Sequence, residues 1–224
     1  MEETESTGLS VVAPLRDLDT ERADSISADV TWRRTPVEVT ATLFDSRIWN
    51  ALAVHRTGRA DYPVEIVNLN GFTRARGTEL IARYHREGFD VIATHMYLMS
   101  TEPDLETGGR REAPLNPRHS ATFDVLRQIG PARVGFEVFY TGRQALDDNP
   151  FRARGFPYVL FGGLVDWAIG SSRVYINVEN LGDVRQTREH PLVRPVRDVD
   201  GRWTVDAWAP LEGRTVNGGV RIRF

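Results

Sequence analysis

Apolar and polar residues alternate along most of this chain, and a period of two is typical of a β-strand rather than of a helix. In residues 134–141, for example, Val134, Phe136 and Val138 would share one face of an extended chain. The alternation recurs in nine segments, at residues 22–33, 37–49, 62–84 (with a break near 70–71), 89–100, 119–128, 133–142, 157–168, 173–181 and 213–224. Nine strands with little helical periodicity predict an antiparallel all-β fold.

Short and long connections alternate between these segments. Four are short, at residues 33–36, 85–88, 129–132 and 169–172, and four are long, at residues 50–61, 101–118, 143–156 and 182–212. In an up-and-down sheet, every short turn then lies at one end and every long loop at the other. Outer-membrane barrels sort their connections in this way, with short periplasmic turns and long extracellular loops. The pattern therefore predicts an up-and-down transmembrane β-barrel.

The aromatic residues agree with a membrane barrel. Short-turn ends of the strands contain Trp32, Tyr84, Phe89, Trp167 and Phe224, and long-loop ends contain Tyr97 and Tyr140. Indole and phenol rings prefer the membrane interface, so two such belts are expected around a lipid-facing wall. The alternative explanation is that they are core aromatics of a soluble β protein. Segments of about ten residues favour the membrane, because soluble strands are typically about five or six residues long.

Each predicted strand has a polar face opposite its apolar face. Its members are Ser27, Asp29, Thr31, Thr40, Thr42, Glu79, Arg83, Glu137, Asn177, Glu179, Asn217, Arg221 and Arg223. In a membrane barrel these side chains would line the lumen, whereas in a soluble protein they would form the solvent face. Alternation alone does not distinguish these two interpretations.

Composition narrows the possible partners and compartments. The 224 residues include 28 Lys and Arg against 31 Asp and Glu, a net charge of −3, which argues against nucleic acid as a partner. There is no cysteine, so disulfides, thiolate metal sites and a cysteine nucleophile are excluded. No apolar run reaches the length of a transmembrane helix, and the acidic N-terminus lacks the features of a secretory signal.

Several motifs together resemble one family. The segment 177–187, Asn-Val-Glu-Asn-Leu-Gly-Asp-Val-Arg-Gln-Thr, resembles the N-x-x-N-L-x-D segment near the end of TonB-dependent outer-membrane receptors. Residues 68–80 are similar to their strand in which an asparagine is followed by G-x-E-L, residues 117–121 to their P-x-H strand start, and residues 140–142 also fit. Residues 20–23 replace the proline of the family's P-E-R with Thr20. The order and spacing of these motifs extend over about residues 20–224.

The resemblance implies the C-terminal part of a barrel of about 22 strands that encloses a plug domain. We expect residues 1–20 to be the end of an extracellular loop and residues 21–224 to be barrel, with plug and signal peptide absent from this chain. The implied function is import of a scarce nutrient, such as a ferric siderophore or cobalamin, across the outer membrane. The implied partners are outer-membrane lipid, the rest of the barrel and plug, and the periplasmic energy-transducing TonB protein, reached through the missing plug.

The end of the chain resembles the signal read by the outer-membrane assembly machinery, a further implied partner. Val220, Ile222 and Phe224 are apolar at alternate positions, and Phe224 is the last residue. We expect these three residues to form that signal.

No enzyme site emerges from the sequence, and we expect no catalytic residues, no cofactor and no metal site. The five histidines lack metal-site spacing, and there is no G-x-S-x-G, P-loop or G-x-G-x-x-G motif. Carboxylates gather in the loops at Glu102, Asp104 and Glu106, at Asp147 and Asp148, and at Asp198 and Asp200. They could hold Ca²⁺ on a flexible loop, but solvated loop residues are the favoured interpretation.

The long loop 182–212 is the best candidate for ligand contact. It contains several cations and two indoles, and from these we single out Arg194 and Trp203 as expected contacts of an anionic or aromatic ligand. Two alternatives to the receptor remain open. A tenth strand at residues 8–15 would give a small self-contained outer-membrane pore, although Pro14 argues against it. The other is a soluble ligand-binding β-barrel with its apolar residues inside.

Overall fold

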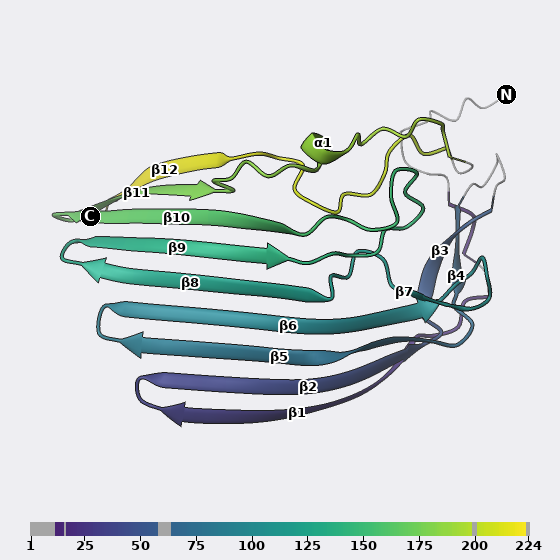
Figure 1. Ribbon diagram of the computed structural model, residues 1–224, viewed down its shortest axis with the longest axis horizontal. Coiled ribbons are helices and arrows are strands. Elements are labelled where there is room, and N and C mark those ends of the chain that lie inside the picture. The colour runs from purple at the N-terminus through teal and green to yellow at the C-terminus, as the bar shows by residue number, and fades with distance from the viewer. Residues whose placement is uncertain (1–11, 16, 58–63, 199–200, 223–224) are drawn as a thin grey trace.

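The computed structural model describes residues 12–15, 17–57, 64–198 and 201–222. Nine long strands form one continuous antiparallel path, in the order β1-β2-β5-β6-β8-β9-β10-β11-β12 (Figure 1). Their bounds are β1 Arg22–Arg34, β2 Val37–Trp49, β5 Phe72–Arg86, β6 Phe89–Pro103, β8 His119–Ile129, β9 Ala132–Thr141, β10 Tyr158–Ile169, β11 Ser172–Glu179 and β12 Thr215–Ile222. The predicted antiparallel up-and-down barrel wall is confirmed, and it is partial because β1 and β12 each pair on one side only.

Four shorter elements lie among the long connections. They are β3 (Leu52–Arg56), β4 (Val64–Asn68), β7 (Arg110–Glu112) and the one-turn helix α1 (Gln186–Glu189). β3 and β4 pair as a separate hairpin, and β7 extends the main sheet beside the end of β6. The segment 62–84, predicted with a break near residues 70–71 and counted as one strand, is two strands, because β4 leaves the wall and pairs with β3. The expected break is where the wall strand β5 begins, just after Gly71, whose positive φ of 112° favours glycine.

The connections sort between the two ends of the sheet as predicted. All four short turns lie together at one end, and the long connections lie at the other (Figure 1). Two residues separate the strands at each short turn, and three of the turns contain a glycine at positive φ: Gly88, Gly130 and Gly170. We call these the turn end and the loop end.

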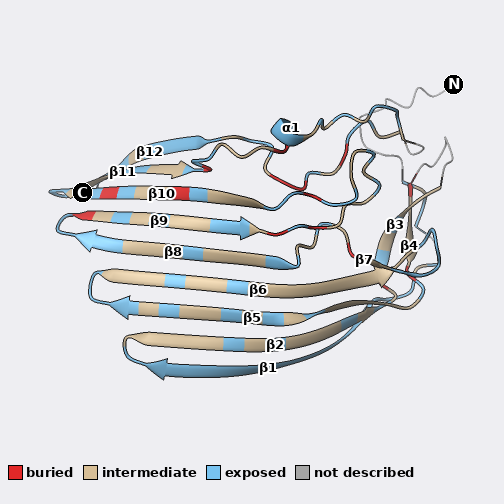
Figure 2. Ribbon diagram, in the orientation of Figure 1, coloured by how far each residue is buried: buried red, intermediate tan, exposed pale blue. Residues whose placement is uncertain are grey.

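The strand register separates the two faces of the wall. Asp29 pairs with Thr42, and Thr42 pairs with Glu79, so polar residues line one face across three strands. The opposite face contains large apolar side chains that are exposed. In Figure 2 the outermost strand β1 is exposed along its whole length. They include Ile26, Val30, Leu43, Leu80, Phe123, Phe136, Phe161, Val165, Ile176, Val216 and Val220. The described members of the predicted polar face share one side, and the apolar side is the one that lipid would cover.

Most of the buried apolar residues lie in the loops rather than in the wall. Of the eight buried apolar residues in the part of the chain that the structure describes, only Ala132 belongs to a long strand; the others are Ala51, Val64, Leu69, Ala113, Val205, Trp208 and Ala209. A membrane wall has no core of its own, since lipid and lumen cover its two faces, and so the compact packing gathers at the loop end. Within the described residues, no helix has the length and apolarity to cross a membrane.

The proposed tenth strand is not seen in the part of it that the structure describes. Val12 makes an isolated parallel bridge with Val64, and the Ala13 N–H donates to the Val64 carbonyl, so this segment contacts the β3–β4 hairpin. Residues 8–11 lie outside the described residues. β1 and β12 also run in the same direction, since an odd number of antiparallel strands separates their ends, and they cannot close an antiparallel barrel on each other.

Candidate ligand-binding loop layer and lumenal face

Two adjacent aspartates link loops that are far apart in the sequence. Asp147 accepts from Arg111, at 2.9 Å, and pairs with Arg56 of β3, at 3.4 Å. Asp148 pairs with Arg56, at 3.3 Å, and with Arg194, also at 3.3 Å. We call Asp147 and Asp148 the aspartate hub. Because it joins the β3–β4 hairpin, the β7 region and loop 182–212, it ties the long connections into one loop layer.

Arg194, one of the two expected ligand contacts, forms a hydrogen bond and ion pairs with other residues of this layer. Its guanidinium donates to the Asp148 backbone carbonyl at 2.7 Å and pairs with Asp198 at 3.6 Å, and only 9% of its side chain is exposed. Arg202 also forms ion pairs with Asp148 and Asp198. Partial burial, followed by the neighbouring Asp198 carboxyl, raises the pKa of Asp148. Arg194 is thus placed to hold loops together.

Trp203, the other expected contact, lies at the surface of the layer. Its side chain is 55% exposed, and the Arg197 guanidinium lies 5.7 Å from the ring centroid. Its backbone carbonyl accepts from the Arg194 N–H at 2.7 Å, which fixes the position of the chain beneath the ring. An exposed indole on an anchored backbone is a low-entropy platform for an apolar or aromatic ligand.

A small core within the loop layer is organised by Gln186, the first residue of α1. This side chain is fully buried, and its Oε1 accepts from the backbone N–H groups of Trp208, at 2.7 Å, and Ala209, at 3.2 Å. Its Nε2 donates to the Asp206 carbonyl at 3.0 Å. A single amide thus satisfies three backbone groups of the returning chain. Nothing in the alternation pattern indicates this role, because Gln186 lies in a connection.

The indole of Trp208 is the largest apolar group in this core. It is 3% exposed and packs edge-on against Phe156, with ring centroids 6.1 Å apart. The Arg152 guanidinium stacks 3.4 Å from the centroid of the Phe156 ring. Beside these rings lies a cavity of about 410 Å³, which is also lined by Tyr158 and Arg185. Its wall also contains Asp183, which pairs with Arg185 and Arg188, and so the cavity offers aromatic rings beside charges that are already paired with one another.

The N-x-x-N-L-x-D segment proves to be a turn that starts loop 182–212. Asn180 accepts from the Val184 N–H at 2.9 Å and donates to the Val184 carbonyl at 2.8 Å, closing the turn. The Asp183 carboxylate accepts from Arg185 at 2.9 Å and from the Arg214 backbone N–H at 3.1 Å. Hydrogen bonding from Arg185, then from the Arg214 N–H, lowers the pKa of Asp183 to about 2. These two residues of the motif therefore orient the loop.

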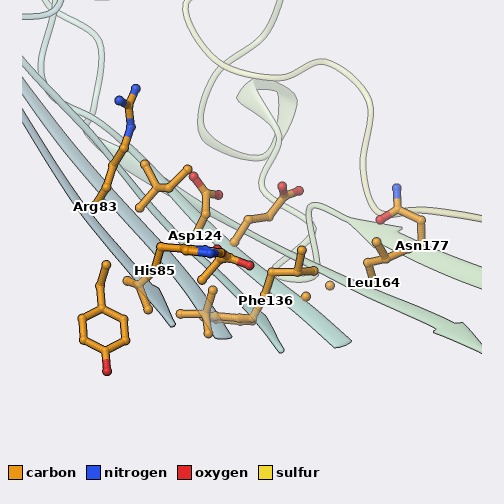
Figure 3. A pocket seen from close by; sticks show the side chains of 15 residues that line it. Arg83, His85, Asp124, Phe136, Leu164 and Asn177 are labelled. Carbon is orange, nitrogen blue, oxygen red and sulfur yellow. The ribbon is translucent and has the colours of Figure 1, made fainter. Parts of the chain in front are cut away.

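The polar face contains a second cavity, of about 660 Å³, towards the turn end of the wall. In Figure 3, Arg83, Asp124 and Asn177 project from the same side of the sheet around it. Asp124 lies directly opposite Glu137 in the register, a like-charge pair that is unfavourable when nothing compensates it. Among the described residues, no cation lies within ion-pair distance of either carboxylate. This surface would therefore attract a positively charged group from whatever fills the lumen.

Glu137 needs space on the neighbouring strand. A Cβ at Gly162, its direct partner on β10, would lie 2.2 Å from the Glu137 Oε1. The absence of a side chain at Gly162 therefore makes room for the carboxylate.

The histidines and loop carboxylates form no metal site in the part of the chain that the structure describes. His95 and His119 lie 3.2 Å apart on adjacent strands, and His190 stacks on Phe151 with ring centroids 6.0 Å apart. Asp104 accepts from the Thr107 hydroxyl and the Glu106 N–H within its own turn, so these bonds occupy its carboxylate. Asp200 lies outside the described residues.

Of the expected assembly signal, Val220 and Ile222 lie on β12, opposite Val174 and Ser172, and both are exposed on the apolar face. Phe224 lies outside the described residues. The role of this signal stays a prediction.

A family model described as the TonB dependent receptor-like β-barrel matches residues 4–181. The chain belongs to the TonB-dependent receptor family. Barrels of this family are outer-membrane proteins, so the soluble alternative is wrong. No curated protein matches the chain.

Solved structures agree with the fold of a TonB-dependent receptor barrel. The FrpB iron transporter from Neisseria meningitidis matches with a TM-score of 0.66 and 17% identity, over 94% of this chain and 32% of its own. The ferric-catecholate import receptor Fiu from E. coli K12 matches with a TM-score of 0.66 and 18% identity, over 91% and 28%. The copper transporter OprC matches with a TM-score of 0.62 and 15% identity, over 91% and 31%. The chain thus spans about a third of the length of these proteins.

Proposed function

We propose that this chain is the C-terminal barrel segment of an active importer for a scarce nutrient, such as a ferric siderophore or cobalamin. The observation that supports it best is the loop layer, in which all four long connections meet at the aspartate hub above a polar lumenal wall. Loops that only joined strands would need neither this ion-pair network nor a buried core. An ordered cover at one end of a lumen is what capture of a bulky solute requires.

Strand parity supports a larger barrel. Nine antiparallel wall strands are described, and a closed all-antiparallel barrel needs an even number, so the remainder must supply an odd number of strands. We expect plug and TonB contact to come from that remainder. Alone, the open edges β1 and β12 would leave backbone groups unpaired in hydrocarbon, at a cost of several kcal/mol for each group. The isolated chain should therefore neither insert stably nor transport.

The test is uptake by the complete receptor that includes this segment. Cells with and without its gene would be given labelled ferric catecholate, ferric hydroxamate, ferric citrate, copper and cobalamin under starvation for each nutrient. We expect loss of energised uptake for one of these compounds. No difference for any of them, with the receptor present in the outer membrane, would contradict the proposal.

Trp203 is the ligand contact that we retain. Trp203→Ala should weaken binding of the compound found in the uptake screen by about tenfold, because an exposed indole contributes large apolar contact at low entropic cost. The matched control is Leu211→Ala, which removes an exposed apolar side chain from the same segment of the loop layer. Equal binding by wild type and Trp203→Ala would remove Trp203 from the site.

A further inference from the structure

One corner of the lipid-facing wall contains an unusual number of charges. At the loop end of β1, β2 and β5, the apolar face gives way to Arg22, Asp24, Asp45, Arg47, Arg74 and Arg76. Alternation places all six on the same face as Ile26, Leu43 and Leu80. Four arginines against two aspartates leave this corner positively charged.

The aspartates neutralise only two of the arginines. Asp24 pairs with Arg22 at 3.0 Å, and Asp45 forms a close bidentate contact with Arg74. Arg47 and Arg76 are exposed and make no ion pair within the described residues. In the register Arg47 lies between Arg74 and Asp24, and Arg76 lies opposite Asp45, so the two aspartates are shared among four arginines and an excess of two positive charges remains at this corner.

A groove of about 420 Å³ begins at Arg76 and follows the apolar face towards the turn end. It is lined by Ile26, Ala28, Leu43, Tyr97 and Met99, with Arg76 and Asp45 at its loop end. The groove therefore has mainly apolar walls along its length, and at its loop end the Arg76 guanidinium lies opposite the Asp45 carboxylate, which is itself paired with Arg74. This polarity matches a lipid, with a chain in the groove and an anionic headgroup above it.

The height of the two arginines also fits a headgroup. Arg76 lies two residues beyond Thr78, which pairs with Tyr97 of the loop-end aromatic belt, or about 7 Å further along the strand. The polar layer on each side of the hydrocarbon is about 5–8 Å thick. Arg47 is a diagonal neighbour of Arg76, at a backbone separation of about 7–8 Å, so both guanidinium groups can reach one phosphate.

We infer that this corner binds a phosphorylated, multiply acylated glycolipid of the outer leaflet, with Arg47 and Arg76 on its phosphate and an acyl chain in the groove. The inference rests on the proposed orientation, with the long loops outside the cell. Guanidinium groups recognise phosphate bidentately, and basic pockets on the membrane face of a protein are typical headgroup sites. The site lies outside the lumen, so it is separate from any nutrient path.

The test measures lipid retained by the complete receptor, purified in detergent and analysed by native mass spectrometry after incubation with a minimal lipopolysaccharide. We expect the double variant Arg47→Gln/Arg76→Gln to retain at least tenfold less lipid than wild type. The matched control is Arg86→Gln, which removes an exposed arginine from the same face of β5 at its turn end. Leu43→Trp fills the groove while both arginines remain, and should lower retention several-fold.

A second measurement needs no variant. Wild type should prefer the phosphorylated lipid over the same lipid without phosphates by at least tenfold. Equal retention of both lipids, or equal retention by wild type and the double variant, would overturn the inference. No nutrient is present in either assay, so these outcomes are independent of the uptake test.

Discussion

The wall and the loop layer of this molecule are stabilised in different ways. Wall strands bury almost no side chains, and much of their apolar face is exposed. The loop layer has a fully buried glutamine, a buried tryptophan and an ion-pair hub. The wall thus depends on its backbone ladder and on the surrounding lipid, whereas the loop layer resembles a small soluble core. Mutations should therefore act locally, and each region should respond to a different kind of change.

The largest expected effect is in the loop layer, at Gln186. Gln186→Leu keeps the volume but leaves the Trp208 and Ala209 N–H groups and the Asp206 carbonyl without partners, and each costs about 1–3 kcal/mol. We expect the local stability of loop 182–212 to fall by about 3 kcal/mol or more. Hydrogen exchange should show faster exchange there and unchanged protection in the wall strands.

Gln128→Leu is the matched control for this prediction. Gln128 is exposed near the end of β8 and its side-chain amide donates to the Gly130 carbonyl at the turn end, so loss of this amide should leave exchange in the loop layer unchanged. If Gln186→Leu left loop 182–212 equally protected, or if the wall strands lost protection with it, the loop layer would not be a separately packed unit.

The wall should be sensitive instead to charge on its apolar face. Ile176 is 55% exposed in the middle of β11, and the adjacent Asn177 points to the polar side. An arginine facing lipid near the bilayer midplane costs about 2–4 kcal/mol, whereas one facing the lumen costs little. We expect Ile176→Arg, but not Asn177→Arg, to destabilise the complete barrel by about that amount in urea unfolding from lipid vesicles.

These two substitutions introduce the same side chain one residue apart, so they control for each other. Equal destabilisation by both would mean that the assignment of the two faces is wrong. The loop layer should keep its hydrogen exchange pattern in both variants.

The same contrast explains what could be predicted from the sequence. The wall strands show a clear alternation of apolar and polar residues, as at Val134, Phe136 and Val138, so their number and their two faces could be predicted from the sequence. The sorting of short turns and long loops between the two ends followed from the positions of these strands along the chain. The separate hairpin β3–β4 was missed, because five-residue strands in a long connection show too little alternation. Gln186 was missed for a different reason. Its partners are the backbone groups of residues about twenty positions away, and backbone groups have no sequence signature. Arg194 was expected to contact ligand, and in the structure it pairs with Asp148 of another loop. This pairing could not be predicted, because it depends on how the two loops meet in space.

The smallest expected effect concerns Asp183 in the N-x-x-N-L-x-D turn. Its pKa is lowered to about 2 in the folded protein, from an ordinary value of 3.8, chiefly by the hydrogen bond from Arg185. A carboxyl group with a lowered folded-state pKa adds stability that is present above pH 3.8 and is lost as the pH falls through about 2.

The difference in local stability between wild type and Asp183→Asn, measured by hydrogen exchange at loop 182–212, should therefore be constant above about pH 5. It should shrink between about pH 4 and pH 2. If the stability difference between wild type and Asp183→Asn stayed constant down to pH 2, Asp183 would act through its shape rather than its charge. The turn would then resemble the uncharged packing around Gln186 more than the ion pairs of the aspartate hub.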